Sequence, residues 1–129
     1  MATKQLLLID DHKDTQTLIK FVLQTNTDWK IIVASDGVEG ITKAELERPD
    51  VILLDFMMPD LDGLAVYEIL KSNLFTGSIP IIFTTAMVHP KAIARLENTQ
   101  AKGIITKPFD FLNLHLQIAK ICQWEFALH

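Results

Sequence analysis

Short, continuous apolar runs alternate along this chain with longer stretches in which apolar residues recur every three or four positions. Such runs are typical of strands covered on both faces, and we expect strands near residues 5–9, 29–34, 51–54, 79–84 and 103–106. Amphipathic helices fill the gaps between them. This alternation predicts an α/β fold of βαβ units around a five-stranded parallel sheet.

The helical stretches are identified by apolar side chains at helical spacing. These are Leu18, Phe21 and Val22; Leu64, Tyr67, Leu70 and Leu74; and Leu112, Leu116 and Ala119. Polar and Pro residues mark the boundaries: Ser35-Asp36 is expected to cap one helix, Arg48-Pro49-Asp50 to end it, and Pro90 to open another.

The 129 residues, 49% of them apolar, suit one domain, with a core at about residues 4–122 and a short C-terminal tail. No apolar run approaches the roughly 18–20 residues that span a bilayer, and no leader opens the chain, so we expect a soluble, cytoplasmic protein. Cys122 is the single cysteine and has no partner for an internal disulfide. A net charge of −4 argues against direct nucleic-acid binding.

The negative charge is unevenly distributed, because 13 of the 16 acidic residues lie in residues 1–68. Most of these are expected on exposed helix faces. Asp10 and Asp11 instead follow the first predicted strand directly, and Asp55 follows the third. Ligands bind at the carboxyl ends of the strands in open α/β sheets, so the three carboxylates are expected to meet there. A donor set of oxygens alone favours a hard ion such as Mg²⁺, although a helix cap is a simpler role for Asp11.

Two more polar residues end predicted strands. Thr85 follows the fourth strand, and Lys107 follows the fifth. A hydroxyl, an ammonium group and a metal ion are the parts needed to hold phosphoryl oxygens. These two residues, taken with the three carboxylates, therefore indicate a phosphoryl-transfer site.

With these residues in place, the chain resembles the receiver domain of two-component response regulators over essentially its full length. The matching segments are Asp10-Asp11, Asp55 to Gly63, Thr85-Ala86, Lys107-Pro108-Phe109, and, less specifically, Ala34 to Gly37. The resemblance implies a flavodoxin-like (βα)5 three-layer sandwich with strand order 2-1-3-4-5.

The resemblance also implies a role for each residue. Asp55 is then the phosphoacceptor, Asp11 and Asp55 bind Mg²⁺ together with the Met57 backbone carbonyl, and Asp10 acts on the ion through water. Thr85 and Lys107 hold the phosphoryl group. The implied partners are a sensor histidine kinase or histidine phosphotransfer protein and a downstream protein target.

Two positions depart from the family pattern. Ile104 stands where the family often has an aromatic residue, so we expect signalling to depend on movement around residues 85–88 rather than on an aromatic rotamer switch. Met57 and Met87 stand where polar residues can position a hydrolytic water, so we expect slow self-dephosphorylation.

Three other functions are alternatives to a phosphoacceptor: an interaction module, a phosphatase and an FMN carrier. The main alternative is a degenerate receiver that acts only as an interaction module. The segment Asp60 to Leu64 resembles the motif of haloacid-dehalogenase-type phosphatases, but Asp60 does not directly end an apolar strand. A flavodoxin-type FMN carrier lacks support because no phosphate-binding loop follows the first strand. The four histidines show no ligand spacing, so surface or cap roles are expected for them.

The stretch from Phe109 to Phe126 has an apolar arc wider than one sheet face requires, and Trp124 falls on its polar side. Two interpretations stay open: a protein-contact surface on the face with the last helix and fifth strand, forming a homodimer or a kinase-docking patch, or a tail that folds back over the core. The sequence equally leaves open a stand-alone regulator or a receiver excised from a longer protein.

Overall fold

Five parallel strands form one sheet, in the order β2-β1-β3-β4-β5, in the computed structural model, which describes residues 3–58, 61–86 and 90–125. The strands are β1 (Gln5–Ile9), β2 (Lys30–Ala34), β3 (Val51–Asp55), β4 (Ile81–Thr85) and β5 (Gly103–Thr106). The helices between and after them are α1 (Lys13–Asn26), α2 (Gly37–Glu47), α3 (Gly63–Ser72), α4 (Pro90–Glu97) and α5 (Leu114–Cys122). The predicted fold class and strand order are confirmed.

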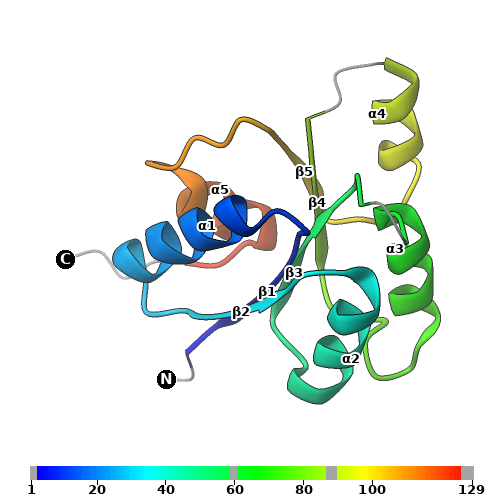
Figure 1. The fold of residues 1–129 in the computed structure, drawn as a ribbon, viewed down its shortest axis with the longest axis horizontal. Helices are drawn as coiled ribbons and strands as arrows, with labels where there is room; N and C mark the ends of the chain where they lie inside the picture. Colours follow the sequence, from blue (N-terminus) through cyan, green and yellow to red (C-terminus); the bar gives the residue numbers. More distant parts are fainter. Residues whose placement is uncertain (1–2, 59–60, 87–89, 126–129) are drawn as a thin grey trace.

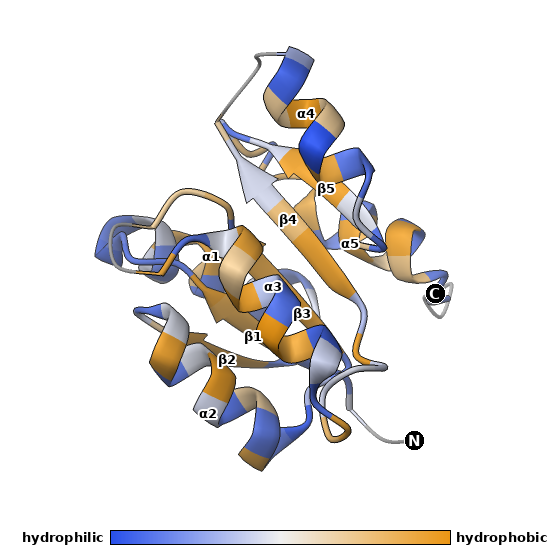
Figure 2. Cartoon of the chain, turned by 90° about the vertical axis from the view of Figure 1, so that its right-hand side faces the viewer, coloured by the Kyte–Doolittle hydropathy of each residue, from blue (hydrophilic) through white to orange (hydrophobic). Residues whose placement is uncertain are grey.

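The sheet is the middle of three layers. Helices α1 and α5 cover one face, and α2, α3 and α4 cover the other (Figure 1). Alternate residues of each strand face opposite layers, so that Leu6 and Leu8 pack with α1 and α5 while Leu7 and Ile9 pack in the other core. The strands are therefore almost continuously apolar (Figure 2), as the sequence pattern indicated.

Helix α2 shows how local polar residues set the boundaries. The Asp36 side chain accepts a hydrogen bond from the Glu39 N–H at 2.8 Å, and the Glu39 side chain accepts one from the Ser35 N–H at 2.9 Å. These bonds satisfy backbone donors at the start of the helix. At the other end, Arg48 adopts a left-handed conformation with φ 45° and ends the helix before Pro49. Both predicted boundaries are confirmed.

The buried faces of two helices differ from the predicted stripes. In α1, Ile19 and Leu23 are buried while Leu18 and Phe21 are exposed. In the last helix the predicted stripe is wrong for Leu112 and Leu116, which are 83% and 48% exposed. Ala119 of that stripe is buried, together with Leu114 and Ile118. Leu112 lies before α5, which begins at Leu114, so it is not part of a helical stripe.

The described part of the C-terminal tail folds back over the core. The Trp124 ring packs edge-on against Trp29 with ring centroids 5.2 Å apart, and Lys4 Nζ lies 4.9 Å from the Trp124 ring centroid. Trp124 is thus partly buried against residues near the start of β1 and β2. This favours the second interpretation of that residue, and a homodimer through the α5 and β5 face stays a prediction. Phe126 lies outside the described residues.

None of the helices in the described part of the chain combines the length and the apolar composition that crossing a bilayer requires.

Replacing Trp124 with Ala tests the contribution of the tail. We expect Trp124→Ala to lower the free energy of unfolding by about 1–3 kcal/mol, because it removes the ring contact with Trp29 and partly buried apolar area. Leu112→Ala is the matched control, and its effect should stay within about 0.5 kcal/mol because that side chain is exposed. Urea unfolding measures both, and equal effects would show that the tail does not stabilise the domain.

Candidate functional site

The sheet register brings the predicted acidic residues together. Ile9 at the end of β1 is paired with Leu54 in β3, so Asp10 and Asp55 come next on neighbouring strands at the same level. Asp55 is itself the last residue of β3, one position later than the predicted strand end, because its backbone still pairs with Thr84 of β4. The two strands flank the point where the strand order reverses, which is where such sheets bind ligands.

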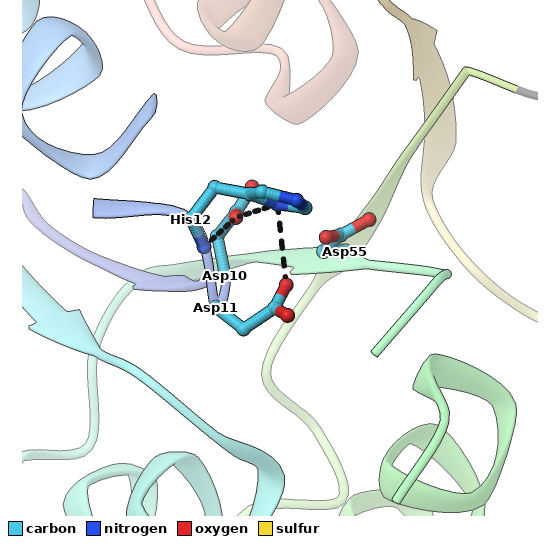
Figure 3. Close-up of side chains that lie close together, drawn as sticks. All are labelled: Asp10, Asp11, His12 and Asp55. Atoms are coloured by element: carbon cyan, nitrogen blue, oxygen red, sulfur yellow. Dashed lines mark hydrogen bonds and ion pairs between the residues drawn. The ribbon is translucent and has the colours of Figure 1, made fainter. Parts of the chain in front are cut away.

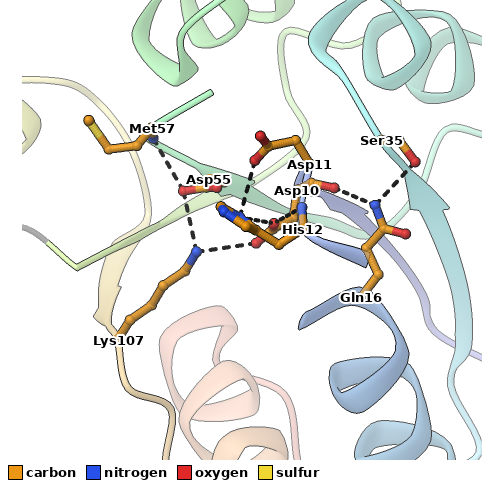
Figure 4. Close-up of polar contacts among 8 residues, drawn as sticks. All are labelled: Asp10, Asp11, His12, Gln16, Ser35, Asp55, Met57 and Lys107. Atoms are coloured by element: carbon orange, nitrogen blue, oxygen red, sulfur yellow. Dashed lines mark hydrogen bonds and ion pairs between the residues drawn. The ribbon is translucent and has the colours of Figure 1, made fainter. Parts of the chain in front are cut away.

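Asp10 is fully buried and is held from several directions (Figure 4). Its Oδ1 accepts a hydrogen bond from the His12 N–H at 2.8 Å, and its Oδ2 lies 3.3 Å from Lys107 Nζ. Gln16 Nε2 donates both to the Asp10 carbonyl and to Ser35 Oγ. The Gln16 amide thereby ties the end of β1 to the residue after β2.

Asp55 is 2% exposed and only half of its carboxylate is occupied by protein contacts. Oδ1 accepts a hydrogen bond from the Met57 N–H at 3.2 Å and lies 3.5 Å from Lys107 Nζ. Oδ2 is buried and has no hydrogen-bond partner among the described residues. Burial raises the pKa of the Asp55 carboxyl above its ordinary value of 3.8, and the charge of Asp10 raises it further, while Lys107 partly offsets the rise.

Lys107 and Thr85 stand where the sequence placed them, at the ends of β5 and β4. The Lys107 N–H donates to the Thr85 carbonyl at 2.8 Å, which fixes the two strand ends side by side. The ammonium group of Lys107 reaches across to both Asp10 and Asp55. Thr85 is buried, and the Lys107–Pro108 peptide bond is cis.

The sequence interpretation missed the position of one side chain, His12. Its Nδ1 lies 3.3 Å from Asp10 Oδ1 and 3.2 Å from Asp11 Oδ1, although the residue is exposed at the start of α1 (Figure 3). The expected surface position is confirmed, because the side chain is 63% exposed; His12 is also the N-cap residue, although its side chain makes no cap hydrogen bond. Its place directly after Asp10-Asp11 was the available signal. Asp11 has no cap role in this structure either, since α1 is preceded by His12.

The residues present fit a divalent metal ion. Asp10, Asp11, His12 and Asp55 each offer a ligand atom, and these atoms all lie within 4.8 Å of one another. Besides Asp55 Oδ2, Asp11 Oδ1 is buried without a hydrogen bond of good geometry, although the His12 ring is within ion-pair distance. Two carboxylates buried together with a third beside them repel one another, and Lys107 supplies only one positive charge.

The segment after β3 is shaped by the close approach of Gly63 to the strand. A Cβ on Gly63 would lie 2.5 Å from the Asp55 carbonyl oxygen, so a side chain is excluded by space rather than by backbone angles. Asp62 caps α3, because its side chain accepts a hydrogen bond from the Ala65 N–H at 2.9 Å. Pro59 and Asp60 lie outside the described residues.

The structure describes only some of the residues that depart from the family pattern. Ile104 is partly buried against the core beside α4, with no aromatic ring at that position. Met57 has a side chain 57% exposed beside Asp55. Met87, Val88 and His89 lie outside the described residues, so the expected movement around residues 85–88 stays a prediction.

Comparisons with a family model and with known proteins identify the same family. Residues 6–119 match the sequence model of the response regulator receiver domain. The chain is 34% identical over 119 residues to the alkaline phosphatase synthesis transcriptional regulatory protein PhoP of Bacillus subtilis, covering 92% of this chain and 48% of that protein. It is 30% identical over 125 residues to the response regulator PleD of Caulobacter vibrioides, covering 96% of this chain and 27% of that protein. This chain therefore spans about half or less of the length of these relatives.

Solved structures share the fold. The chemotaxis protein CheY4 of Vibrio cholerae superposes with a TM-score of 0.85 at 25% identity, covering 93% of this chain and 99% of that one. The bacteriophytochrome response regulator AtBRR covers 100% of this chain and 99% of its own at a TM-score of 0.80 and 23% identity, a likeness of fold.

Burial of the Asp55 carboxylate is expected to affect the free energy of unfolding in the absence of metal. Because its folded pKa is raised, ionised Asp55 destabilises the folded state above that pKa, and the penalty disappears as the pH falls below 3.8. We expect Asp55→Asn to raise the free energy of unfolding at neutral pH in EDTA by on the order of 1 kcal/mol.

Asp62→Asn is the matched control, since Asn caps a helix as well as Asp and the side chain is exposed, and its effect should stay within about 0.5 kcal/mol. Urea unfolding at neutral pH and again at acidic pH measures the difference. A lower free energy of unfolding for Asp55→Asn than for the wild type at neutral pH would contradict the prediction that the ionised carboxylate destabilises the folded state.

Proposed function

Because this chain belongs to the response regulator receiver domain family, we propose that it is a signalling phosphoacceptor in which Asp55 takes a phosphoryl group from a phosphohistidine on a partner protein. The observation that carries the proposal is the Asp55 carboxylate. It is buried at the switch point of the sheet, with one oxygen bonded to Met57 and near Lys107 and the other without a hydrogen-bond partner among the described residues.

The transfer follows from the arrangement of these groups. Asp55 Oδ2 attacks phosphorus, and a new O–P bond forms as the P–N bond to the partner's imidazole breaks. The bonding electron pair leaves on the imidazole nitrogen, which takes up a proton. Lys107, already 3.5 Å from Asp55 Oδ1, lies close enough to pair with a phosphoryl oxygen, and Thr85 at the neighbouring strand end is proposed to hold another.

Receiver domains bind Mg²⁺ at an acidic cluster of this kind, and here we assign the ion to Asp11, Asp55 and the Met57 carbonyl, with Asp10 acting through water. When bound, Mg²⁺ supplies positive charge that offsets the carboxylates and the phosphoryl oxygens. The protein's own contribution is to hold the carboxylates together. Asp10 is fixed by the His12 N–H and Lys107, and Asp55 by the Met57 N–H.

The proposed partners are a sensor histidine kinase or a histidine phosphotransfer protein and a downstream protein target. PhoP is named a transcriptional regulatory protein and is about twice the length matched here. In this chain the proposed output is a change in a protein-docking face, set off at Asp55 and passed through the Thr85 end of β4. We place this chemistry in the cytoplasm, where kinases of this class present phosphohistidine.

Phosphorylation by a small donor tests the proposal and separates it from the degenerate-receiver alternative. With Mg²⁺ and acetyl phosphate, we expect intact mass spectrometry to show one added phosphoryl group on the wild-type protein and none on Asp55→Asn. Asp62→Asn, the exposed cap residue seven positions away, is expected to be modified like the wild type. No added mass on the wild type would favour an interaction module.

The exposed Met57 side chain is expected to lengthen the lifetime of the phosphoryl group on Asp55. An apolar side chain there cannot position water by a hydrogen bond, so we expect loss of the group to take minutes or longer. Met57→Asn should shorten the lifetime several-fold, because its amide can orient a water molecule. Mass spectrometry after removal of acetyl phosphate measures both, and a wild-type lifetime of seconds would contradict the prediction.

A further inference from the structure

A nitrogen donor lies against the carboxylates that the proposed magnesium site uses. His12 Nδ1 is 3.3 Å from Asp10 Oδ1 and 3.2 Å from Asp11 Oδ1. With Asp55, these side chains turn toward a common point (Figure 3). Across residues 3–58, 61–86 and 90–125 this is the one group of three or more His, Cys, Asp or Glu residues found close enough to share an ion.

The measured separations match those of ligands around one small cation. Two donor atoms each about 2.1 Å from an ion lie about 3.0 Å apart in octahedral geometry and about 3.4 Å apart in tetrahedral geometry. The 3.2 Å between His12 Nδ1 and Oδ1 of Asp11, a carboxylate assigned to the ion, falls between these values. Independently, Asp55 Oδ2 is buried and unpartnered among the described residues, so a lone pair is available to a cation on the opposite side of the group.

Within the described residues, the polar contacts of the His12 ring are limited to the carboxylates of Asp10 and Asp11. The side chain is 63% exposed, which excludes a packing role. It makes no hydrogen bond to the first turn of α1, although its residue is the N-cap. Its polar contacts in the described structure are the carboxylates of Asp10 and Asp11, and the shorter of its bonds to Asp10 uses the backbone N–H rather than the ring.

We infer that His12 is a further protein ligand of this site and that its imidazole shifts the preference of the site from Mg²⁺ toward the later first-row transition metal ions. The inference rests on the same carboxylates as the proposed function. A neutral imidazole suits Fe, Ni, Cu and Zn ions, whereas Mg²⁺ prefers oxygen donors and retains its water. Adding one nitrogen to the carboxylate and carbonyl oxygen ligands therefore strengthens binding of the later metals selectively.

Metal titration of the full chain tests the inference without relying on phosphorylation. Ni²⁺ and Mg²⁺ are titrated separately by calorimetry, and Co²⁺ is followed by its visible absorption, which responds to a nitrogen ligand. We expect His12→Ala to lower the ratio of the Ni²⁺ to the Mg²⁺ association constant about tenfold or more and to change the Co²⁺ spectrum. His115→Ala, which alters a histidine on α5, should leave the ratio unchanged.

Two results would overturn the inference. One is an unchanged Ni²⁺ to Mg²⁺ ratio in His12→Ala, with circular dichroism showing that the variant is folded. The other is full Ni²⁺ affinity in Asp11→Asn, which would place the ion on surface histidines away from the carboxylates.

Acetyl phosphate labelling of the same wild-type preparation keeps the two proposals apart. Labelling of Asp55 together with an unchanged ratio refutes the His12 role alone. Absent labelling together with a lowered ratio refutes the phosphoacceptor function alone.

Discussion

Electrostatic repulsion among Asp10, Asp11 and Asp55 sets the demands that the surrounding structure meets. Asp10 and Asp55 are buried at the same level of neighbouring strands, where water screens their charges little. Lys107 lies within ion-pair distance of both, and backbone N–H groups of His12 and Met57 bond to them. These contacts reduce the electrostatic cost of the cluster without removing it, and the remaining cost is the physical basis of the proposed cation site.

The parallel sheet is what holds such a cluster in place. Its strands are buried on both faces, so their ends cannot shift in register without exposing apolar side chains to solvent. The positions of the site residues at the strand ends are thereby fixed by the two apolar cores rather than by the polar contacts themselves. Polar residues then refine the edge: Gln16 connects the ends of β1 and β2, and the Lys107 N–H connects β5 to β4.

The side chains of the candidate site differ in their exposure to solvent. Asp10 and Asp55 are buried, whereas the side chains of His12 and Met57 beside them are exposed. Neither exposed side chain belongs to an apolar core, so substitution at these two positions leaves both cores intact. The chain spans about half or less of relatives such as PhoP and PleD, which place the same kind of domain in longer proteins.

The sequence by itself determined the strands and, through the family resemblance, their order, because doubly covered strands are continuously apolar. It also picked out Asp10, Asp11, Asp55, Thr85 and Lys107 as candidate site residues, because a polar residue that ends such a strand is conspicuous. Only the tertiary structure decided which helix faces are buried, since Leu112 and Leu116 fit a helical spacing along the sequence as well as Leu114 and Ile118 do. Only the tertiary structure showed that Trp124 packs against Trp29 and that the His12 ring lies beside the carboxylates of Asp10 and Asp11. Side-chain direction and long-range contact depend on packing in three dimensions, which spacing along the chain does not contain.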